Sequence, residues 1–327
     1  MHFSLPKLAA AAAIVVSSAA VLPANAQEPW TPTRPVRLVL GYTPGGAADA
    51  VARDLAPAME KVLGQPVVVD YKPGAGGAIG VETVASAPAD GYTIGLADVA
   101  PLTIIPNARK VSYDPMNGLS YIGVVSKAPM VILVNPSVPA TNLPELLKLV
   151  RADPGGVSYS TSGLATIHQM SAELLGASTG TTMLHVPYKG AAPALTDLLA
   201  GAVKVSFSTI APAVQIVKSG KARAIAVTST KPVPAFPGVK TVAEQGVPGY
   251  DAQGWFALVG PKGMPPEVVQ RLNVALNSAL NTPALRDKLL SQGNDVVPST
   301  PEAASELVKS DLQKWGRVIR EQNLHFD

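Results

Sequence analysis

The chain has 327 residues, of which 47% are hydrophobic and 15% charged, with a formal net charge of +3 and no cysteine. A chain of this length can bury a core that needs neither disulfide bonds nor a structural metal ion, and the absence of cysteine excludes thiol chemistry and thiolate metal sites. The nearly neutral charge, with no basic stripe interleaved with aromatic residues, argues against nucleic acid as a partner.

The N-terminal residues have the pattern of a secretory signal peptide. Residues 1–26 contain one lysine, then an apolar run, then Ala-Asn-Ala at 24–26, a small-x-small cleavage pattern. Two serines and a proline interrupt the run, which is short for a membrane span of about 20 apolar residues. We therefore expect export, cleavage after Ala26, and a mature chain of 327 − 26 = 301 residues with a charge of 25 − 23 = +2.

A strand, a bend and a helix follow in order. Residues 36–40 place apolar side chains at alternate positions, which predicts a strand with one buried face. After a Thr-Pro-Gly-Gly bend, apolar residues recur at helical spacing from Asp49 to Gly64, where glycine is a typical C-cap. Asp49 and Arg53 have the spacing of an ordinary ion pair on one helix face. The helix start would attract anions, although a plain strand-to-helix turn has the same composition.

Strand-like and helix-like segments alternate along nearly the whole chain, which is typical of an α/β protein. The expected strands include residues 66–71, 92–98, 157–161, 203–209 and 223–228. The expected helices include residues 143–152, 191–200, 211–219, 265–280 and 302–322.

Two segments are long enough to cross between domains. Residues 121–136 hold two β-rich runs around Lys127 to Pro129, and residues 249–265 would form a return crossing. The sequence therefore predicts two α/β domains joined by two crossing strands, with a ligand cleft between them. Domain 1 would be discontinuous, and the expected bounds are 27–126 with 253–327 for domain 1 and 127–252 for domain 2.

A second unusual bend joins a strand to a helix at residues 160–166, Ser-Thr-Ser-Gly-Leu-Ala-Thr, and we expect that helix to end near Gly176. Its hydroxyl groups could cap the helix or bind an anion, and a cap is the simpler interpretation of this motif alone. Two such loops in separate domains, facing each other across a cleft, would offer helix N-termini and free donors to one ligand carboxylate.

Other motifs give weaker signals. Residues 72–80 contain G-x-G-x-x-x-G after a strand, but export and the lack of a suitably placed acidic residue argue against a dinucleotide. His168 lies near Ser162 and Thr166, which leaves an exported Ser/His hydrolase open, although such a histidine is more often structural. The histidines show no metal-ligand spacing. We expect no catalytic residue, no cofactor and no metal.

Six segments, in order along the chain, carry a resemblance to a known family: residues 41–57, 70–93, 158–176, 186–201, 219–229 and 241–265. Together they resemble the Bug-type solute receptors of tripartite tricarboxylate transporters over nearly all of the mature chain. The resemblance implies a two-domain periplasmic binding protein of the "Venus flytrap" type II class, which closes on a small organic acid and delivers it to a membrane permease. The carboxylate would be held between the two loops, partly through water.

The resemblance also indicates site residues. Pro44, Gly45, Gly46 and Asp49 match the family's first loop, and the second loop matches at Ser162, Gly163 and Thr166. The full set of expected ligand-binding residues is Tyr42, Pro44, Gly45, Gly46, Ala47, Asp49, Asp98, Thr161, Ser162, Gly163, Thr166, Tyr188 and Ser208.

Departures from the family pattern concern selectivity. This chain has Ala165 and Gln169 where the family usually has glycine and histidine, and Asp98 where the family has uncharged residues or histidine. Lys204 and Ser208 replace residues that are commonly acidic. We therefore expect a carboxylate ligand whose distal end differs from that of a dicarboxylate or an acidic amino acid.

The expected function is capture without catalysis by a monomeric receptor whose partners are a small organic acid and the permease subunits. A sensory receptor with the same fold, which hands its closed form to a signalling protein, stays open as an alternative.

Overall fold

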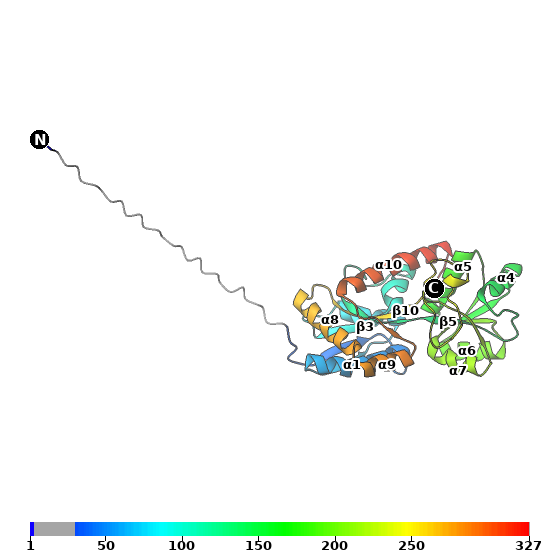
Figure 1. Ribbon diagram of the computed structural model, residues 1–327, viewed down its shortest axis with the longest axis horizontal. Coiled ribbons are helices and arrows are strands. Elements are labelled where there is room, and N and C mark those ends of the chain that lie inside the picture. The colour runs from blue at the N-terminus through cyan, green and yellow to red at the C-terminus, as the bar shows by residue number, and fades with distance from the viewer. Residues whose placement is uncertain (3–29, 327) are drawn as a thin grey trace.

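The computed structural model describes residues 1–2 and 30–326, so the expected cleavage site and nearly all of the expected signal peptide lie outside the described residues. The described chain forms two lobes, which Figure 1 shows side by side. Within the described residues, no helix combines the length and the apolar character that a membrane crossing requires.

The first lobe contains a six-stranded sheet built from both halves of the chain. Its strand order is β11-β4-β10-β3-β1-β2, with β1 parallel to β2 and β3, and β10 antiparallel to β3 and β4. The strands are β1 (Val36–Leu40), β2 (Val67–Tyr71), β3 (Thr93–Asp98), β4 (Leu119–Ala128), β10 (Gly254–Pro261) and β11 (Asp295–Val296). The helical segments are α1 (Ala47–Leu63), η1 (Ala75–Gly77), α2 (Ala78–Ala85), η2 (Ala100–Ile104), α3 (Ile105–Ala108), α8 (Pro266–Leu280), α9 (Pro283–Ser291) and α10 (Pro301–Glu321).

The second lobe contains a five-stranded sheet of order β7-β6-β8-β5-β9. β6 runs parallel to β7 and β8, whereas β5 runs antiparallel to β8 and β9. The strands are β5 (Met130–Val134), β6 (Ser158–Thr161), β7 (Leu184–Pro187), β8 (Val205–Thr209) and β9 (Arg223–Val227). The helical segments are α4 (Leu143–Ala152), α5 (Ile167–Thr179), α6 (Ala191–Ala200), α7 (Ile210–Lys218) and η3 (Ala243–Gln245).

The chain passes between the two sheets twice. β4 belongs to the first sheet and β5 to the second, so Pro129 is the link between them, as the sequence predicts for this region. After β9 the chain returns to the first sheet at β10. The carboxyl ends of β3 and β8 lie at the junction of the lobes, where Asp98 and Thr209 line one pocket. The exact domain bounds stay a prediction.

β1 is buried on both faces, not on one. Leu38 and Leu40 pack in a cluster with α1, whereas Val39, 1% exposed, packs in a different cluster with α2. A central parallel strand covered by helices on both sides has this burial. The expectation of a single buried face is therefore wrong, because alternation in the sequence does not reveal that α2 covers the second face.

The helix of the second bend ends later than expected. α5 continues to Thr179, and Gly180 ends it in a left-handed conformation with φ 62°. Gly176 is inside the helix, where a Cβ atom would lie 2.8 Å from the carbonyl oxygen of Thr181. Close packing, and not helix termination, explains this glycine.

Glycine also allows α2 to lie directly against the end of β1. A Cβ atom on Gly80 would lie 2.6 Å from Cα and 2.8 Å from N of Gly41, and both are rigid backbone atoms. We predict that Gly80→Ala lowers the free energy of unfolding by about 1–3 kcal/mol through overpacking, although alanine favours a helix. Glu82→Ala, at an exposed position on the same helix, is the control and should change the stability by less than about 0.5 kcal/mol. Chemical denaturation measures both variants, and equal stabilities would contradict the close approach.

Candidate functional site

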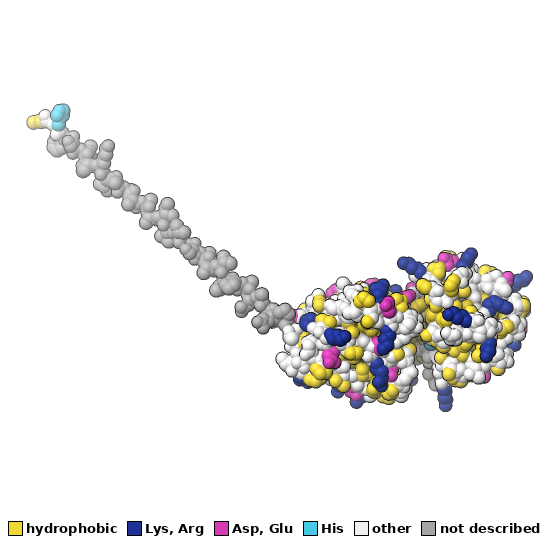
Figure 2. All heavy atoms as spheres, turned by 60° about the horizontal axis from the view of Figure 1, so that its bottom comes forward, with side chains coloured by type: hydrophobic (Ala, Val, Ile, Leu, Met, Phe, Trp, Pro, Cys, Tyr) yellow, Lys and Arg dark blue, Asp and Glu magenta, His cyan; other side chains and the backbone are white. Residues whose placement is uncertain are grey.

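Two adjoining pockets of about 470 Å³ each open at the junction of the lobes. Both volumes suit a small organic ligand. Figure 2 shows the two lobes with a constriction between them and Lys and Arg side chains scattered over both. The first pocket is lined by Tyr42, Gly76, Asp98, Ala100, Ile105, Ala108, Arg109, Ser162, Leu164, Ala165, Thr166, Ile167, His168 and Phe326. The second is lined by Gly45, Gly46, Ala47, Ala50, Asp98, Val99, residues 128–130, Ile167, His168, Thr209, Ala211, Pro212, residues 254–256 and residues 291–294.

Three residues line both pockets. Asp98, at the carboxyl end of β3, comes from the first lobe, and Ile167 and His168, at the start of α5, come from the second. These residues therefore mark the place where the two pockets meet. A ligand that extends across the cleft would contact all three.

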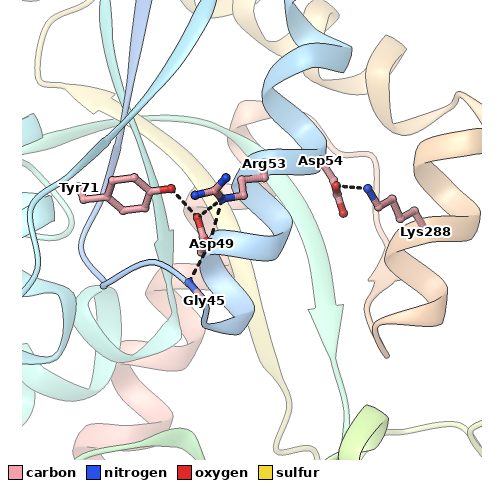
Figure 3. A network of polar contacts seen from close by, with 6 residues as sticks. All are labelled: Gly45, Asp49, Arg53, Asp54, Tyr71 and Lys288. Carbon is pink, nitrogen blue, oxygen red and sulfur yellow. Dashed lines mark hydrogen bonds and ion pairs between the residues drawn. The ribbon is translucent and has the colours of Figure 1, made fainter.

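The first loop leads into α1 and is held in shape by Asp49. The carboxylate of Asp49 accepts hydrogen bonds from the backbone N–H of Gly45 at 2.8 Å, from the hydroxyl of Tyr71 at 2.6 Å and from Nε of Arg53 at 2.9 Å (Figure 3). The predicted Asp49–Arg53 ion pair is confirmed. Hydrogen bonds from Tyr71 and Gly45 lower the pKa of Asp49. As at every helix start, the first backbone N–H groups of α1 have no intrahelical partner, and Gly46 and Ala47 line the second pocket.

The second loop is held by its own side chains. Thr166 caps α5: its hydroxyl accepts from the N–H of Gln169 and donates to the carbonyl oxygen of Gly163 at 2.8 Å. The side-chain oxygen of Gln169 accepts from the N–H of Ala165 at 2.9 Å. The cap interpretation of this motif therefore accounts for Thr166, because its hydroxyl already has partners.

A serine–histidine contact lies beside this cap. Ser162 Oγ is 2.9 Å from Nδ1 of His168, while Nε2 of His168 is buried and has no hydrogen-bond partner. Burial lowers the pKa of His168 to about 4, so the ring is neutral at pH 7. His168 contacts Ser162 and also lines both pockets, so the prediction that it has a structural role stays a prediction.

Asp98 is the corresponding group on the first lobe. The hydroxyl of Tyr42 lies 2.8 and 2.9 Å from the two carboxylate oxygens and donates to them, and the N–H of Ala100 donates to Oδ1 at 3.1 Å. Burial raises the pKa of Asp98 to about 6, and the hydrogen bonds from Tyr42 and Ala100 only partly offset this effect. Asp98 takes part in none of the ion pairs found among the described residues.

The structure brings together part of the expected site. Tyr42, Ser162 and Thr166 line the first pocket, Gly45, Gly46 and Ala47 line the second, and Asp98 lines both. The remaining expected residues lie outside the lining of these two pockets: Pro44, Asp49, Thr161, Gly163, Tyr188 and Ser208.

Three of these remaining residues make hydrogen bonds with other parts of the protein. Thr161 is buried and contacts Nε2 of His185 at 2.7 Å, and Tyr188 donates to Asp197 at 2.6 Å. Ser208 is buried in β8 and donates to the carbonyl oxygen of Thr209, its neighbour, which lines the second pocket.

Several lining residues were absent from the expected set. Arg109, which donates to the carbonyl oxygen of Ala75 at 2.9 Å, and Phe326 bound the first pocket, and Gly293 bounds the second. These residues have no motif, and the C-terminal segment reaches the cleft only after the chain has folded. Among the described residues, no group of three or more His, Cys, Asp or Glu side chains could hold a metal ion.

The anchoring of the first loop gives a graded stability prediction. Asp49→Ala should lower the free energy of unfolding by about 2–3 kcal/mol, and Tyr71→Phe, which removes one of the same hydrogen bonds, by about 1 kcal/mol. Because the pKa of Asp49 is lower in the folded state than its ordinary value of 3.8, the stabilisation is present above that pH and is lost as the pH falls through the folded pKa. Urea denaturation at pH 7 measures both variants, and repeating it below pH 3.8 measures the pH dependence. An order reversed between the two variants at pH 7 would contradict the network.

Unlike the carboxylate of Asp49, the ionised carboxylate of Asp98 is expected to lower the stability of the folded protein. The pKa of Asp98 is about 6 in the folded state and 3.8 ordinarily, so the folded protein binds the proton more tightly than the unfolded chain does. The ionised carboxylate therefore lowers the stability in full above pH 6, and this cost disappears below pH 3.8. The upper limit is (6 − 3.8) × 1.36, or about 3 kcal/mol. We predict that Asp98→Asn stabilises the ligand-free protein by about 1–3 kcal/mol at pH 7 and by less than about 1 kcal/mol at pH 4. Denaturation at the two pH values measures this, and a less stable variant at pH 7 would contradict it.

Known proteins resemble this chain in sequence and in structure. The sequence pattern of the tripartite tricarboxylate transporter family receptor matches residues 51–324. BugT of Bordetella pertussis is 33% identical over 320 residues, which cover 97% of this chain and 98% of BugT. Among solved structures, Rpa4515 of R. palustris with adipate has a TM-score of 0.76 and 32% identity, over 88% of this chain and 97% of that one. MatC of Rhodopseudomonas palustris with bound malate has a TM-score of 0.75 and 28% identity, over 88% of this chain and 99% of that one.

These likenesses confirm the resemblance and the expected two-domain periplasmic binding protein fold of type II. The chain therefore belongs to the family of tripartite tricarboxylate transporter receptors.

Proposed function

We propose that this receptor captures a small organic carboxylate in the cleft between its two lobes and presents it to the membrane permease of a tripartite tricarboxylate transporter. One observation carries the proposal: two helix N-termini, of α1 and of α5, belong to different lobes and open on adjoining pockets that share three residues. Helix N-termini favour anions. The relatives with bound adipate and malate support a carboxylate as the anion.

The free backbone donors suffice for a useful affinity. A dissociation constant of about 1 μM corresponds to about 8 kcal/mol, and a hydrogen bond to a charged group contributes about 1.5–3 kcal/mol. The N–H groups of Gly46 and Ala47 at the first loop, with donors from the start of α5, could therefore hold a carboxylate without a buried arginine. Gly46 and Ala47 belong to the expected ligand-binding residues, whereas the N–H of Gly45 is already used by Asp49.

Capture would proceed by closure of the lobes. The ligand binds first to the donors of one lobe, and the closed form gains the donors of the other, so the ligand shifts the population toward closure. The two crossings, at Pro129 and before Gly254, are where the backbone would bend. The closed form, which exposes a different surface from the open form, would then be the one that the permease binds.

The geometry of His168 argues against the hydrolase alternative. A general-base histidine takes the serine proton on one ring nitrogen while a carboxylate orients the other. Here Ser162 contacts Nδ1, and Nε2 has no partner among the described residues. We therefore propose binding without catalysis. We also propose that residues 1–26 direct export and are removed after Ala26, which would place the receptor in the periplasm.

A thermal-shift screen tests the proposal. The mature protein is unfolded and refolded to remove any ligand carried through purification, then heated with mono-, di- and tricarboxylates. A ligand at 100 times its Kd adds about 2.7 kcal/mol to the stability, which raises the Tm visibly.

Matched amides of the same acids serve as the control, because they keep the size of the ligand and lose the negative charge. A selective shift with one group of carboxylates and none with the amides is the expected result. If the folded protein responds to no carboxylate, or equally to acids and amides, the proposal is wrong.

A further inference from the structure

Two polar side chains, Asp98 and His168, line both pockets, and each has hydrogen-bonding capacity that the described protein does not use. Asp98 offers carboxylate oxygens that accept two kinds of hydrogen bond, from Tyr42 and Ala100, although an ionised carboxylate has about four acceptor positions. Nε2 of His168 is buried and accepts or donates no hydrogen bond within the described protein. Both residues line both pockets. A bound ligand is therefore the group that could satisfy them.

The charges around Asp98 restrict what can bind there. Of the described residues that line the second pocket, Asp98 is the only charged one, and the first pocket adds only Arg109, which forms no ion pair with Asp98. A ligand carboxylate placed directly against Asp98 would meet a like charge in a poorly solvated site. An O–H or N–H group placed there would instead receive a charge-assisted hydrogen bond.

His168 suits the opposite kind of group. Its ring is neutral, so one nitrogen carries a proton and the other accepts. If the hydroxyl of Ser162 donates to Nδ1 over 2.9 Å, the proton is on Nε2, which then donates. A carboxylate oxygen at Nε2 selects this tautomer. The start of α5 adds the positive end of a helix dipole at the same place.

We propose that the ligand is a carboxylic acid that also bears a hydroxyl or amino group, with the carboxylate on the His168 side of the cleft and the O–H or N–H group on Asp98. This inference rests on the proposed function and narrows its ligand class. It also gives a reason for the part-buried Asp98, which has no ion-pair partner among the described residues: the carboxylate costs stability in the empty protein and selects the donor-bearing acid in the occupied one. Such a repulsive element raises selectivity by rejecting the wrong ligand.

Matched acids that differ in one group test the proposal. One series is succinate, malate and aspartate, and a longer one is adipate, 2-hydroxyadipate and 2-aminoadipate. Isothermal titration of the refolded wild-type protein should show a donor-bearing acid that binds about 10- to 100-fold more tightly than its parent acid, which is the effect of one hydrogen bond to a charged group. Comparison of the hydroxyl and amino members identifies which donor Asp98 prefers.

Variants of Asp98 and His168 test which side chain sets the preference for the donor-bearing acid. Asp98→Asn should reduce the preference to less than about threefold, whereas Asp287→Asn, which removes the same charge at an exposed position on α9, should keep the wild-type ratio. His168→Leu should weaken the parent acid and the donor-bearing acid by a similar factor and leave their ratio unchanged.

The outcomes separate the two proposals. If the parent acids bind and the added hydroxyl or amino group gives no advantage in either series, the inference is wrong and the carboxylate receptor stands. A preference that survives in Asp98→Asn also overturns the inference, and the wild-type comparison decides if that variant does not fold. If no acid of any kind binds the folded wild-type protein, the proposed function fails together with the inference.

Discussion

The hydroxyl group of Tyr42 connects the loops that follow three parallel strands of the first lobe. Tyr42 comes directly after β1, donates to Asp98 at the end of β3, and has its oxygen 3.1 Å from the carbonyl oxygen of Gly76 in the segment after β2. Burial and the neighbouring carboxylate raise the pKa of Tyr42, so it remains a donor at any physiological pH. Tyr42 is thus the one side chain that donates to Asp98 among the described residues, and the same hydroxyl links the segments that follow β1, β2 and β3.

The two loops that face the cleft are stabilised by different side-chain contacts. The carboxylate of Asp49, within α1, holds the first loop through the N–H of Gly45, and the N–H groups of Gly46 and Ala47 donate none of the hydrogen bonds found among the described residues. In the second loop, Thr166 and Gln169 use two of the backbone donors themselves. The second lobe consequently offers fewer free N–H groups and adds a side chain, His168, in their place. This asymmetry suggests that the first lobe provides most of the backbone donors and that the second lobe contributes more to selectivity.

Local patterns in the sequence predict the elements well and the site less completely. The first strand, loop and helix could be predicted because hydrophobic period, bend residues and the C-cap at Gly64 all agree, and this agreement has a physical cause in the backbone itself. The end of α5 could not, because Gly176 and Gly180 both look like termination signals and only packing against Thr181 distinguishes them. Alternation of apolar residues along β1 likewise cannot reveal that α2 covers its second face, since this depends on how separate segments of the chain pack.

In the candidate site, too, some residues belong to local sequence motifs and others come together only through tertiary folding. Gly45, Gly46 and Ser162 belong to motifs that the sequence displays, whereas Arg109 and Phe326 reach the cleft through tertiary folding alone. Thr161, Tyr188 and Ser208 lie close to the site in the sequence, yet their polar atoms contact His185, Asp197 and a backbone carbonyl. Which side of a strand or loop faces the cleft is set by the pairing of β6, β7 and β8, and a single sequence does not state that pairing.

The central claim is that one ligand joins two lobes, and a distance measurement across the cleft tests it most directly. Because the chain has no cysteine, spin labels can be attached at two introduced cysteines, Glu60→Cys on α1 and Lys148→Cys on α4, both at exposed positions in different lobes. Pulsed electron paramagnetic resonance should show a distance distribution that becomes narrower and shifts to shorter distances when a saturating carboxylate is added. If the distribution is the same with and without a carboxylate that demonstrably binds, the ligand does not bring the lobes together and the account is wrong.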